Sequence, residues 1–242
     1  MSVRITTLPE ITRPDVGIVK VGTWLVDKPD RQRATVEAIG EAGRSQDWPD
    51  PRLLSWSVMV GEDGRSLLYY SQWRDEEGYQ DFIRTGRDAY EAEIDAAVPE
   101  IERVGPGSYE LYRSQAAVDG DTRVPGCVVI ADIEFEGPDR GRQRDWTDTV
   151  VAALVNDEHL DPAAIAAHFH LSTDGTRVLN YAEWENAEGH LAALNAPGDG
   201  IGSDTELWAR VQTFPGRVSS TVNRYTPAIS LSADQDDWLK DF

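Results

Sequence analysis

Apolar and polar residues alternate along the chain in stretches that predict strands and helices in a fixed order. In the first half, segments rich in β-branched and aromatic residues predict four strands, and apolar residues at helical spacing predict two helices. The strands are expected at residues 17–26, 55–60, 66–73 and 108–113, and the helices around residues 30–42 and 79–94. The predicted order of this half is therefore β-α-β-β-α-β.

The second half predicts the same order. Strands are expected at residues 128–135, 166–171, 178–184 and in a last segment that ends near Tyr225, and helices at 142–155, from about 187 and around 207–211. This order is that of the split β-α-β or ferredoxin-like unit, in which helices cover one face of an antiparallel sheet. The other face would stay apolar in an isolated half, so we expect the two sheets to pack against each other.

A sequence repeat links the two halves. Residues 67–79 (LLYYSQWRDEEGY) are echoed by residues 178–190 (VLNYAEWENAEGH), at a constant offset of 111 positions that takes Trp73 to Trp184. An Asp-Gly pair precedes each copy, at Asp63-Gly64 and Asp174-Gly175, and Asp-Gly is a strong signal for a two-residue hairpin turn. The repeat predicts a duplicated domain.

The repeat and the linker composition divide the chain of 242 residues into five segments. We expect an N-terminal arm at 1–14, a first ferredoxin-like domain at 15–113, a polar linker at 114–125, a second ferredoxin-like domain at 126–226, and an acidic, peripheral tail at 227–242. The predicted fold class is α+β, with two tandem domains that form an internal pseudo-dimer. We therefore expect either a monomer that contains this internal pseudo-dimer or a weak homodimer.

The formal net charge of −20 argues against a nucleic-acid partner, because clustered Lys and Arg are needed to neutralise phosphates. No apolar run approaches the length of a membrane helix, and the first residues lack the apolar core of a signal peptide. We therefore expect a soluble, cytoplasmic protein without a membrane partner. Cys127, the single cysteine, stands in an apolar segment and is expected to be a small buried residue.

The repeated motif resembles the antibiotic biosynthesis monooxygenase family of dimeric α/β barrels, here in tandem. The resemblance rests on the Asp-Gly pair, the strand VLNYAEW and the helix start ENAEGH. It implies a tailoring enzyme of aromatic polyketide or related secondary metabolism, which takes a small aromatic substrate. The activity expected first is that of a cofactor-independent monooxygenase, with dioxygen as co-substrate, that oxidises a phenolic polycyclic substrate to a quinone.

Quinone-forming members of this family carry an Asn, then a Trp four residues on, then a Tyr six residues later. Asn180 and Trp184 match the first two positions, and His190 occupies the third. In the first half Trp73 and Tyr79 match, and Tyr69 replaces the Asn. Neither half keeps the full set, which leaves three alternatives: two altered sites, one active and one degenerate site, or none.

Strand alternation places Asn180, Ala182 and Trp184 on one face, and the hairpin puts Phe169 opposite Asn180. The same construction groups Trp56, Tyr69 and Trp73 in the first half. Both faces should meet the helices and form aromatic, sparsely polar pockets. The candidate catalytic residues are Asn180, Trp184, His190 and Tyr79, and the candidate substrate-binding residues are Trp73, Tyr69, Trp56 and Phe169.

The resemblance implies chemistry that needs no metal and no flavin. His190 is the expected base, because histidine titrates near operating pH. Asn180 is expected to hold an oxyanion through its amide, and Trp184 to stack on the substrate ring. In the first half, Tyr79 is the candidate for proton transfer, with Tyr69 as a hydrogen-bond partner.

Each of these residues also has a structural interpretation. Trp73 and Trp184 would serve equally well as core residues, Asn180 as a satisfied structural amide, and His190 as a solvated side chain. His168 and His170 share a strand face, but two histidines without a third ligand do not make a metal site. The glycine-rich residues 197–202 follow a helix and lack the lysine of a phosphate-binding loop, so a lid or connector is expected.

Three other activities fit the same fold. A polyketide cyclase would use the same His, Tyr and Asn side chains without dioxygen. A non-catalytic small-molecule-binding or stress-response protein would have a filled or closed pocket beside Trp184. Haem degradation is disfavoured because no matching His lies on the helix that would supply an axial ligand.

Overall fold

The computed structural model describes residues 3–195 and 205–233, and it has the predicted α+β fold. Two compact units make up the described chain: unit 1 comprises residues 3–108 and 226–233, and unit 2 comprises residues 109–195 and 205–225. The predicted connector at 197–202 and the apolar tail residues Trp238, Leu239 and Phe242 lie outside the described residues.

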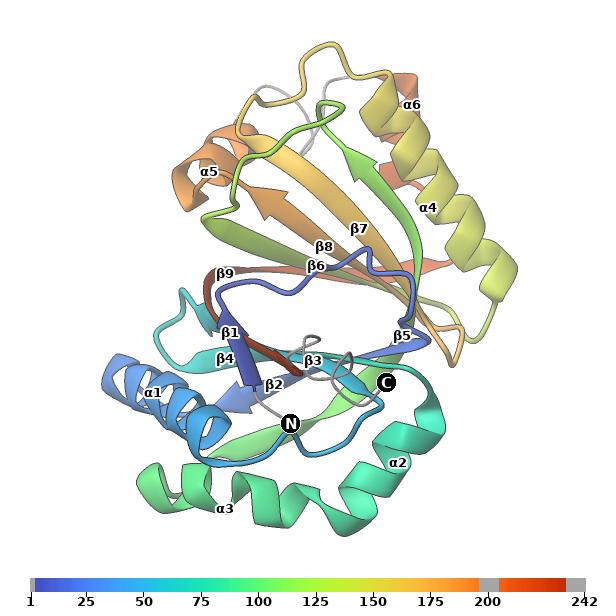
Figure 1. Cartoon of the computed structure of the whole chain (residues 1–242). Helices are drawn as coiled ribbons and strands as arrows, with labels where there is room; N and C mark the ends of the chain where they lie inside the picture. Colours follow the sequence, from blue (N-terminus) through green and yellow to red (C-terminus); the bar gives the residue numbers. More distant parts are fainter. Residues whose placement is uncertain (1–2, 196–204, 234–242) are drawn as a thin grey trace. The chain divides into compact units, whose positions relative to one another are not determined.

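Unit 1 is a sheet with helices along one face (Figure 1). Its strands are β1 (Val3–Thr6), β2 (Ile18–Leu25), β3 (Leu53–Gly61), β4 (Ser66–Trp73), the first part of β5 (Glu102–Ala116) and the last part of β9 (Arg217–Ala233). They lie in the order β1-β9-β3-β4-β2-β5. The helices are α1 (Pro29–Ser45), α2 (Glu76–Thr85) and α3 (Arg87–Ala97). From β2 to β5 the element order is the predicted one, except that the single helix expected around residues 79–94 is two helices, α2 and α3, which meet at Gly86.

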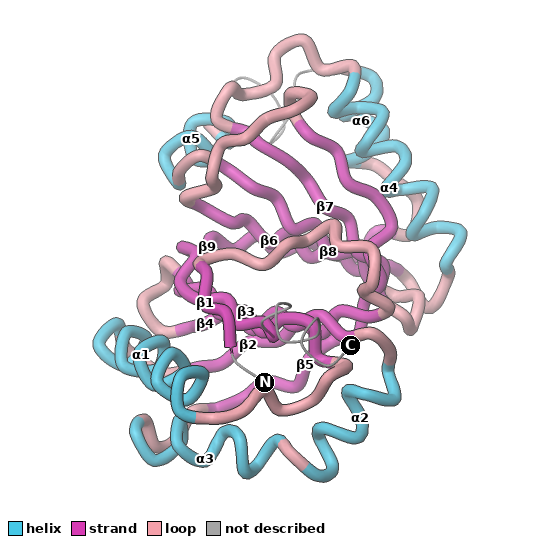
Figure 2. Tube along the Cα trace, in the orientation of Figure 1, coloured by secondary structure: helices cyan, strands magenta, loops and turns pink. Residues whose placement is uncertain are grey.

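Unit 2 has the corresponding order of elements (Figure 2). Its sheet contains β6 (Cys127–Phe135), β7 (Ala164–Ser172), β8 (Arg177–Trp184), the last part of β5 and the first part of β9. These strands lie in the order β5-β7-β8-β6-β9, and every neighbouring pair is antiparallel. The helices are α4 (Arg140–Val155), α5 (Ala187–Leu194) and α6 (Glu206–Gln212), and α4 contacts α6.

Strands β5 and β9 each belong to both units, because β5 passes from unit 1 to unit 2 at Ser108–Tyr109 and β9 returns from unit 2 to unit 1 at Tyr225–Thr226. The prediction that residues from 227 onward form a peripheral tail is therefore wrong for 227–233. Ile229 and Leu231 are buried in the core of unit 1. Gly43 of α1 allows this strand to approach, since a Cβ there would lie 3.0 Å from a methyl carbon of Leu231.

Both Asp-Gly pairs lie in hairpin connections as predicted, but each connection is wider than the two residues expected, because β3 ends at Gly61 and β4 begins at Ser66, and β7 ends at Ser172 and β8 begins at Arg177. Gly64 and Gly175 have φ values of 74° and 80°, in the left-handed region that favours glycine. Asp63 Oδ1 accepts hydrogen bonds from the backbone N–H groups of Arg65 and Ser66, and Asp174 Oδ1 accepts one from the N–H group of Thr176. The Asp side chain therefore fixes each turn, which explains why both residues recur in the repeat.

The repeated glycine at each helix start has a steric cause. Asp75 caps α2 by accepting from Gly78 N, and Asn186 caps α5 by accepting from Gly189 N. A Cβ at Gly78 would lie 2.7 Å from Arg52 Cβ, and one at Gly189 would lie 2.3 Å from Ala163 Cβ. Any larger residue would therefore push the helix away from the neighbouring loop.

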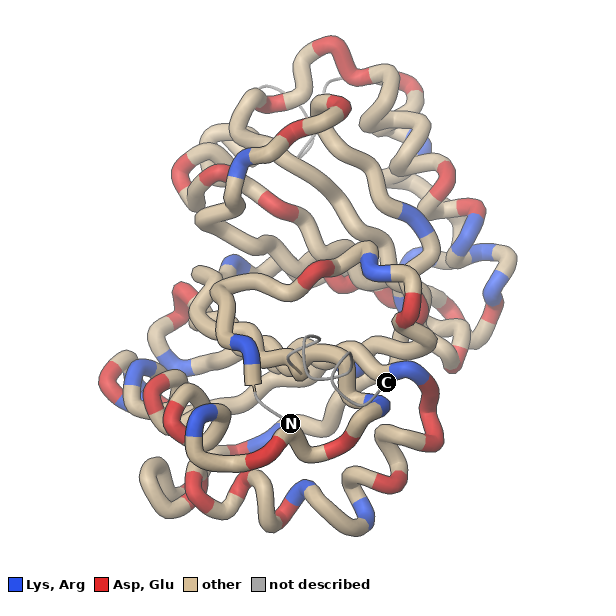
Figure 3. Tube along the Cα trace, viewed as in Figure 1, with Lys and Arg blue, Asp and Glu red and all other residues tan. Residues whose placement is uncertain are grey.

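Acidic residues are distributed over both units and do not gather in one segment (Figure 3). The excess of negative charge is thus spread along the described residues of both units. Within the described residues, no helix has the length and apolar composition that crossing a membrane requires.

Candidate functional site

Unit 2 contains a cavity of about 640 Å³ between its sheet and its helices. The strand side of the cavity is lined mainly by small side chains, namely Val129, Ala131, Ala164, Ala166, Ala167, Asn180 and Ala182. The helix side is larger and more aromatic, with Trp146, Val150 and Leu154 of α4, His190 of α5 and Trp208 of α6. Small residues facing large ones leave a hollow where most domains would have a packed core.

The strand register explains which residues reach this cavity. Across β6 and β8, Cys127 pairs with Trp184 and Ala131 pairs with Asn180. Because side chains alternate along a strand, Asn180, Ala182 and Trp184 share one face, as predicted. The same face of β9 presents Ser220 and Val222, which are solvent-exposed, so the cavity is accessible from this edge strand.

The structure brings three of the predicted catalytic residues together, since Asn180, Trp184 and His190 all line the cavity. Trp184 and His190 meet edge to face, with ring centroids 5.0 Å apart and an angle of 73° between the planes. His190 is fully buried, which differs from the solvated side chain considered from sequence. Phe169, by contrast, lies in the hydrophobic core of unit 2 and outside the cavity lining.

Asn180 carries an unused acceptor. Its Oδ1 atom is buried and accepts no hydrogen bond from any described residue. Trp146 Nε1 is likewise buried, and no acceptor for it exists in the part of the chain that the structure describes. An unmade hydrogen bond of a buried group costs about 1 to 3 kcal/mol. The filled core of unit 1 contains such groups as well, at Trp56 Nε1 and Tyr90 Oη. Asn180 and Trp146 differ from these because they line the cavity, where a ligand would reach them.

The corresponding region of unit 1 is filled by aromatic side chains. Trp24 stacks on Tyr69 with centroids 5.9 Å apart and an interplanar angle of 13°, and Trp56 contacts both rings. Trp56 also lies 5.2 Å from the ring centroid of Tyr90. The predicted substrate-binding residues Trp56, Tyr69 and Trp73 therefore all lie in or against the core of unit 1.

The paired strands show what replaces these rings in unit 2. At the repeat offset, Trp56 corresponds to Ala167, and Tyr69 corresponds to Asn180. Leu67 corresponds to Val178 at the repeat offset. Because Trp24 pairs with Leu67 and Ile133 pairs with Val178, Trp24 corresponds to Ile133. Three large aromatic residues in unit 1 are thus matched by an alanine, an asparagine and an isoleucine, which accounts for the hollow in unit 2.

Tyr79, the remaining predicted catalytic residue, packs edge to face on Trp73 with centroids 5.5 Å apart. Burial, with the nearby charge of Glu76 adding to it, raises the pKa of the Tyr79 hydroxyl. Lys20 lies under its ring, 4.0 Å from the centroid, and donates to the Glu76 carboxylate at 2.7 Å. Tyr79 is therefore protonated at neutral pH and is poorly suited to act as a base.

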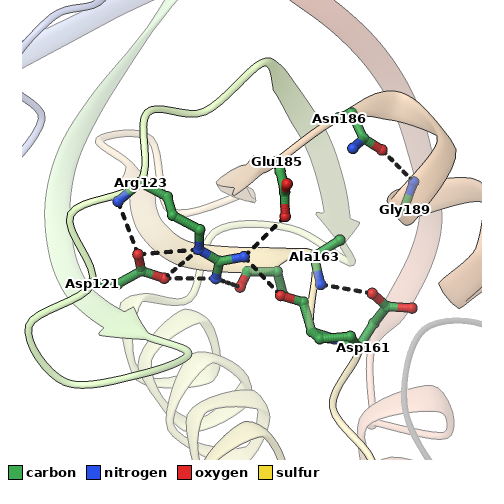
Figure 4. A network of polar contacts seen from close by, with 9 residues as sticks. Asp121, Arg123, Asp161, Ala163, Glu185, Asn186 and Gly189 are labelled. Atoms are coloured by element: carbon green, nitrogen blue, oxygen red, sulfur yellow. Dashed lines mark hydrogen bonds and ion pairs between the residues drawn. The ribbon is translucent and has the colours of Figure 1, made fainter.

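The linker forms part of the cavity wall, a feature that the sequence analysis missed. Ala116, Ala117 and Asp119 line the cavity. Arg123 holds the linker in place, donating to Asp121 at 2.6 Å, to Glu185 at 3.2 Å and to the backbone oxygens of Pro162 and Ala164 at 2.8 and 2.9 Å (Figure 4). Glu185 directly follows Trp184, so this network fixes the linker beside the candidate site. The sequence signal that could have indicated this network is the spacing of Asp121 and Arg123, with one residue between them.

His168 and His170 have other partners than a metal ion. His168 Nδ1 lies 2.8 Å from Ser114 Oγ, its Nε2 lies 3.6 Å from Glu183 Oε2, and His170 Nδ1 donates to the His168 carbonyl at 3.0 Å. In the described ranges no three His, Cys, Asp or Glu side chains are grouped so as to hold a metal ion.

His170 makes the stability of the protein depend on pH. Burial lowers its pKa to about 3, because the protonated ring would lose its hydration. Between pH 6.5 and 3 the unfolded chain binds a proton that the folded chain does not, so stability falls as pH falls, by about 1.4 kcal/mol per pH unit. We expect His170→Gln to reduce this slope in urea unfolding experiments between pH 6.5 and 5. His159→Gln, at an exposed position, should keep it, and equal slopes in all three proteins would refute the assignment.

Comparison with known proteins shows the fold. No protein-family model matches the chain, and no curated protein matches it in sequence. Among solved structures, an anthrone oxidase-like protein has a TM-score of 0.67 at 15% identity, over 90% of this chain and 94% of that chain. A candidate monooxygenase from Fusobacterium nucleatum has a TM-score of 0.57 at 9% identity, over 91% and 96% of the two chains. A candidate monooxygenase from Lactobacillus acidophilus has a TM-score of 0.53 at 8% identity, over 86% and 93%.

Proposed function

We propose that this protein is a cofactor-independent monooxygenase that oxidises a phenolic polycyclic substrate to a quinone in the cavity of unit 2. The observation that carries the proposal is the presence of Asn180, Trp184 and His190 in the lining of one cavity. The fold shared with an anthrone oxidase-like protein and with candidate monooxygenases supports the same reaction class.

The size and lining of the cavity suit a flat aromatic molecule. A volume of about 640 Å³ lies within the range of about 300 to 1,000 Å³ that is typical of small-molecule sites. Trp146, Trp184 and Trp208 offer ring faces or edges, and alanines on the strand side leave room for a planar substrate. Few polar groups are present, so those few would set the orientation.

In the proposed reaction His190 takes a proton from the substrate, an anthrone or a related phenol. The amide of Asn180 donates to the resulting oxyanion, and Trp184 holds the ring. The oxyanion is one resonance form of a carbanion, which transfers one electron to dioxygen, and the radical pair combines into a peroxide anion. The protonated His190 returns its proton to this anion, which gives the hydroperoxide and restores the base. Loss of water then gives the quinone carbonyl, so one oxygen atom enters the product and the other leaves in water. The buried setting of His190 keeps water away from these steps.

Unit 1 fits the role of a degenerate partner under this proposal. The rings of Trp24, Trp56 and Tyr69 fill the space that corresponds to the cavity, and the pKa of Tyr79 is raised by burial. Of the alternatives left open by the sequence, one active and one degenerate site is therefore the one we favour.

The test is dioxygen uptake by the purified full-length protein with a series of hydroxyanthrones, after dialysis against a metal chelator. We expect one dioxygen consumed per quinone formed, measured by an oxygen electrode and by the quinone absorption band. Consumption of substrate without dioxygen uptake would instead identify a cyclase. Binding without any turnover would identify a non-catalytic binding protein.

A further inference from the structure

The charged residues of the cavity are unevenly distributed. Arg217 is the only Lys or Arg in the lining among the described residues. Its guanidinium makes no hydrogen bond and no ion pair within the described parts of the chain. Other arginines of unit 2 are bound closely by carboxylates; Arg123 pairs with Asp121 and Glu185, and Arg177 pairs with Asp132. A cavity cation without a partner among the described residues, in a chain of net charge −20, is available to an anion from solution.

The position of Arg217 is set by the strand register. On β6, Phe135 pairs with Arg217 of β9, and Ala131 pairs with Asn180 of β8. Four residues along a strand correspond to about 13 Å, and the two strands flanking β6 are about 10 Å apart. The backbones of Arg217 and Asn180 are therefore separated by roughly 16 Å. The distance from the guanidinium to the Asn180 amide is shorter if the long arginine side chain extends toward Asn180. A fused polycyclic substrate with one substituent would span this gap.

The acidic residues of the lining lie toward the other end of the cavity. Glu183 directly precedes Trp184, but its side chain lies on the opposite face of β8, where its carboxylate is 3.6 Å from His168 Nε2. Asp157 follows the C-terminus of α4 and accepts a hydrogen bond from Trp208 Nε1 at 2.8 Å, and Asp119 belongs to the linker that leads to Cys127. Cys127 pairs with Trp184, so the linker reaches the cavity at the Trp184 end.

A second cation lies close to Arg217. The Arg142 guanidinium packs against Gly216, where an added Cβ would lie 3.0 Å from its Nε atom. Arg142 Nη2 lies 3.7 Å from the Asp139 carboxylate, and its Nη1 donates to the backbone oxygen of Glu136 at 2.5 Å. The cavity is therefore basic at one end and acidic at the other, and a molecule with one anionic end would have a single favourable orientation.

We propose that Arg217 binds a carboxylate on the substrate, at the end remote from the ring that is oxidised. The substrate is then an aromatic polycyclic acid, and Arg217 is the residue that selects it and fixes its direction. This inference rests on the proposed function for the identity of the reacting ring, but its binding step is independent of turnover.

The experiment uses anthraquinone-2-carboxylate and its uncharged carboxamide as probes, with quenching of tryptophan fluorescence as the readout. We expect the full-length protein to bind the carboxylate at least tenfold more tightly than the amide. This ratio corresponds to about 1.4 kcal/mol. Arg217→Gln should bring the ratio close to one without changing the affinity for the amide, and Arg217→Lys should keep part of the preference. Arg210→Gln removes the same charge from an exposed site on α6 and should leave the ratio unchanged.

The role of Arg217 would be overturned by equal affinity of the unaltered protein for both probes, or by an equal loss of preference in Arg210→Gln. Binding of neither probe would overturn it as well. The proposed function is judged separately by dioxygen uptake. Oxidation of neutral and acidic anthrones at equal rates would refute the role of Arg217 and leave the oxygenase intact. A clear carboxylate preference without any oxidation would refute the oxygenase and leave the anion site.

Discussion

Ala167→Trp is expected to lower turnover by at least about 100-fold. The substitution places in unit 2 the residue that unit 1 carries at the corresponding position, Trp56. An indole there would occupy the cavity that Ala167 lines. A substrate that can no longer enter loses its binding free energy, and a 100-fold loss of turnover corresponds to about 2.7 kcal/mol. The measurement is kcat/KM for quinone formation together with the affinity for a product analogue.

The matched control is Trp56→Ala in unit 1. Trp56 is 4% exposed and contacts three aromatic rings, so its removal should lower stability by about 3 to 5 kcal/mol while turnover in unit 2 persists. Ala167→Trp should show the reverse pattern, with a folded protein and lost turnover. If Ala167→Trp retained full activity, or if Trp56→Ala abolished it in a folded protein, the site would not lie in unit 2.

Asn180→Ala is expected to lower kcat by about 100- to 1,000-fold, the cost typical of removing one donor to a developing oxyanion. Its effect on stability should be small. Asn180 Oδ1 has no hydrogen-bond partner within the described residues, so alanine removes a buried polar atom that the native chain leaves unsatisfied. Rates at saturating substrate and a urea unfolding curve on the same preparation separate the two effects.

The repeat again supplies the control for Asn180. Tyr69 corresponds to it in unit 1 and stacks on Trp24, so Tyr69→Phe keeps the stacking and removes the hydroxyl. We expect this variant to retain activity. A structural role of Asn180 would instead appear as lost stability with unchanged kcat, and that pattern would remove the oxyanion assignment.

The turns and helix caps of this fold depend on residues that are close together in the chain, so they can be predicted from the sequence. The turns at Gly64 and Gly175 need a left-handed backbone, and the caps of α2 and α5 need a short polar side chain. Strand alternation then placed Asn180 and Trp184 on the face that lines the cavity, with no information from distant residues.

The sequence predicted a pocket in each half but could not tell which of the two is open, because that depends on residues far apart in the chain. Whether a pocket is open is decided by the volumes that meet there, such as Trp24 with Trp56 in unit 1 against Ile133 with Ala167 in unit 2. Arg217 could not be identified from the sequence either. It stands out because no carboxylate of the described residues pairs with its guanidinium. No periodicity or motif reveals such a lack.

The burial of Ile229 and Leu231 illustrates the same limit from another side. The acidic composition near the C-terminus indicated a solvated tail, yet two apolar residues at alternate positions of β9 reach the core of unit 1. Each fully buried side chain of this kind contributes about 1.5 to 3 kcal/mol to the free energy of folding. Two of them therefore favour docking of the strand although acidic residues follow it in the sequence.

The sharing of β5 and β9 has a consequence for how a substitution in one unit affects the other. Each of these strands runs on from the sheet of one unit into the sheet of the other. In unit 2 both are edge strands, so a substitution that unpairs β5 or β9 within unit 1 should also loosen an edge of the sheet in unit 2.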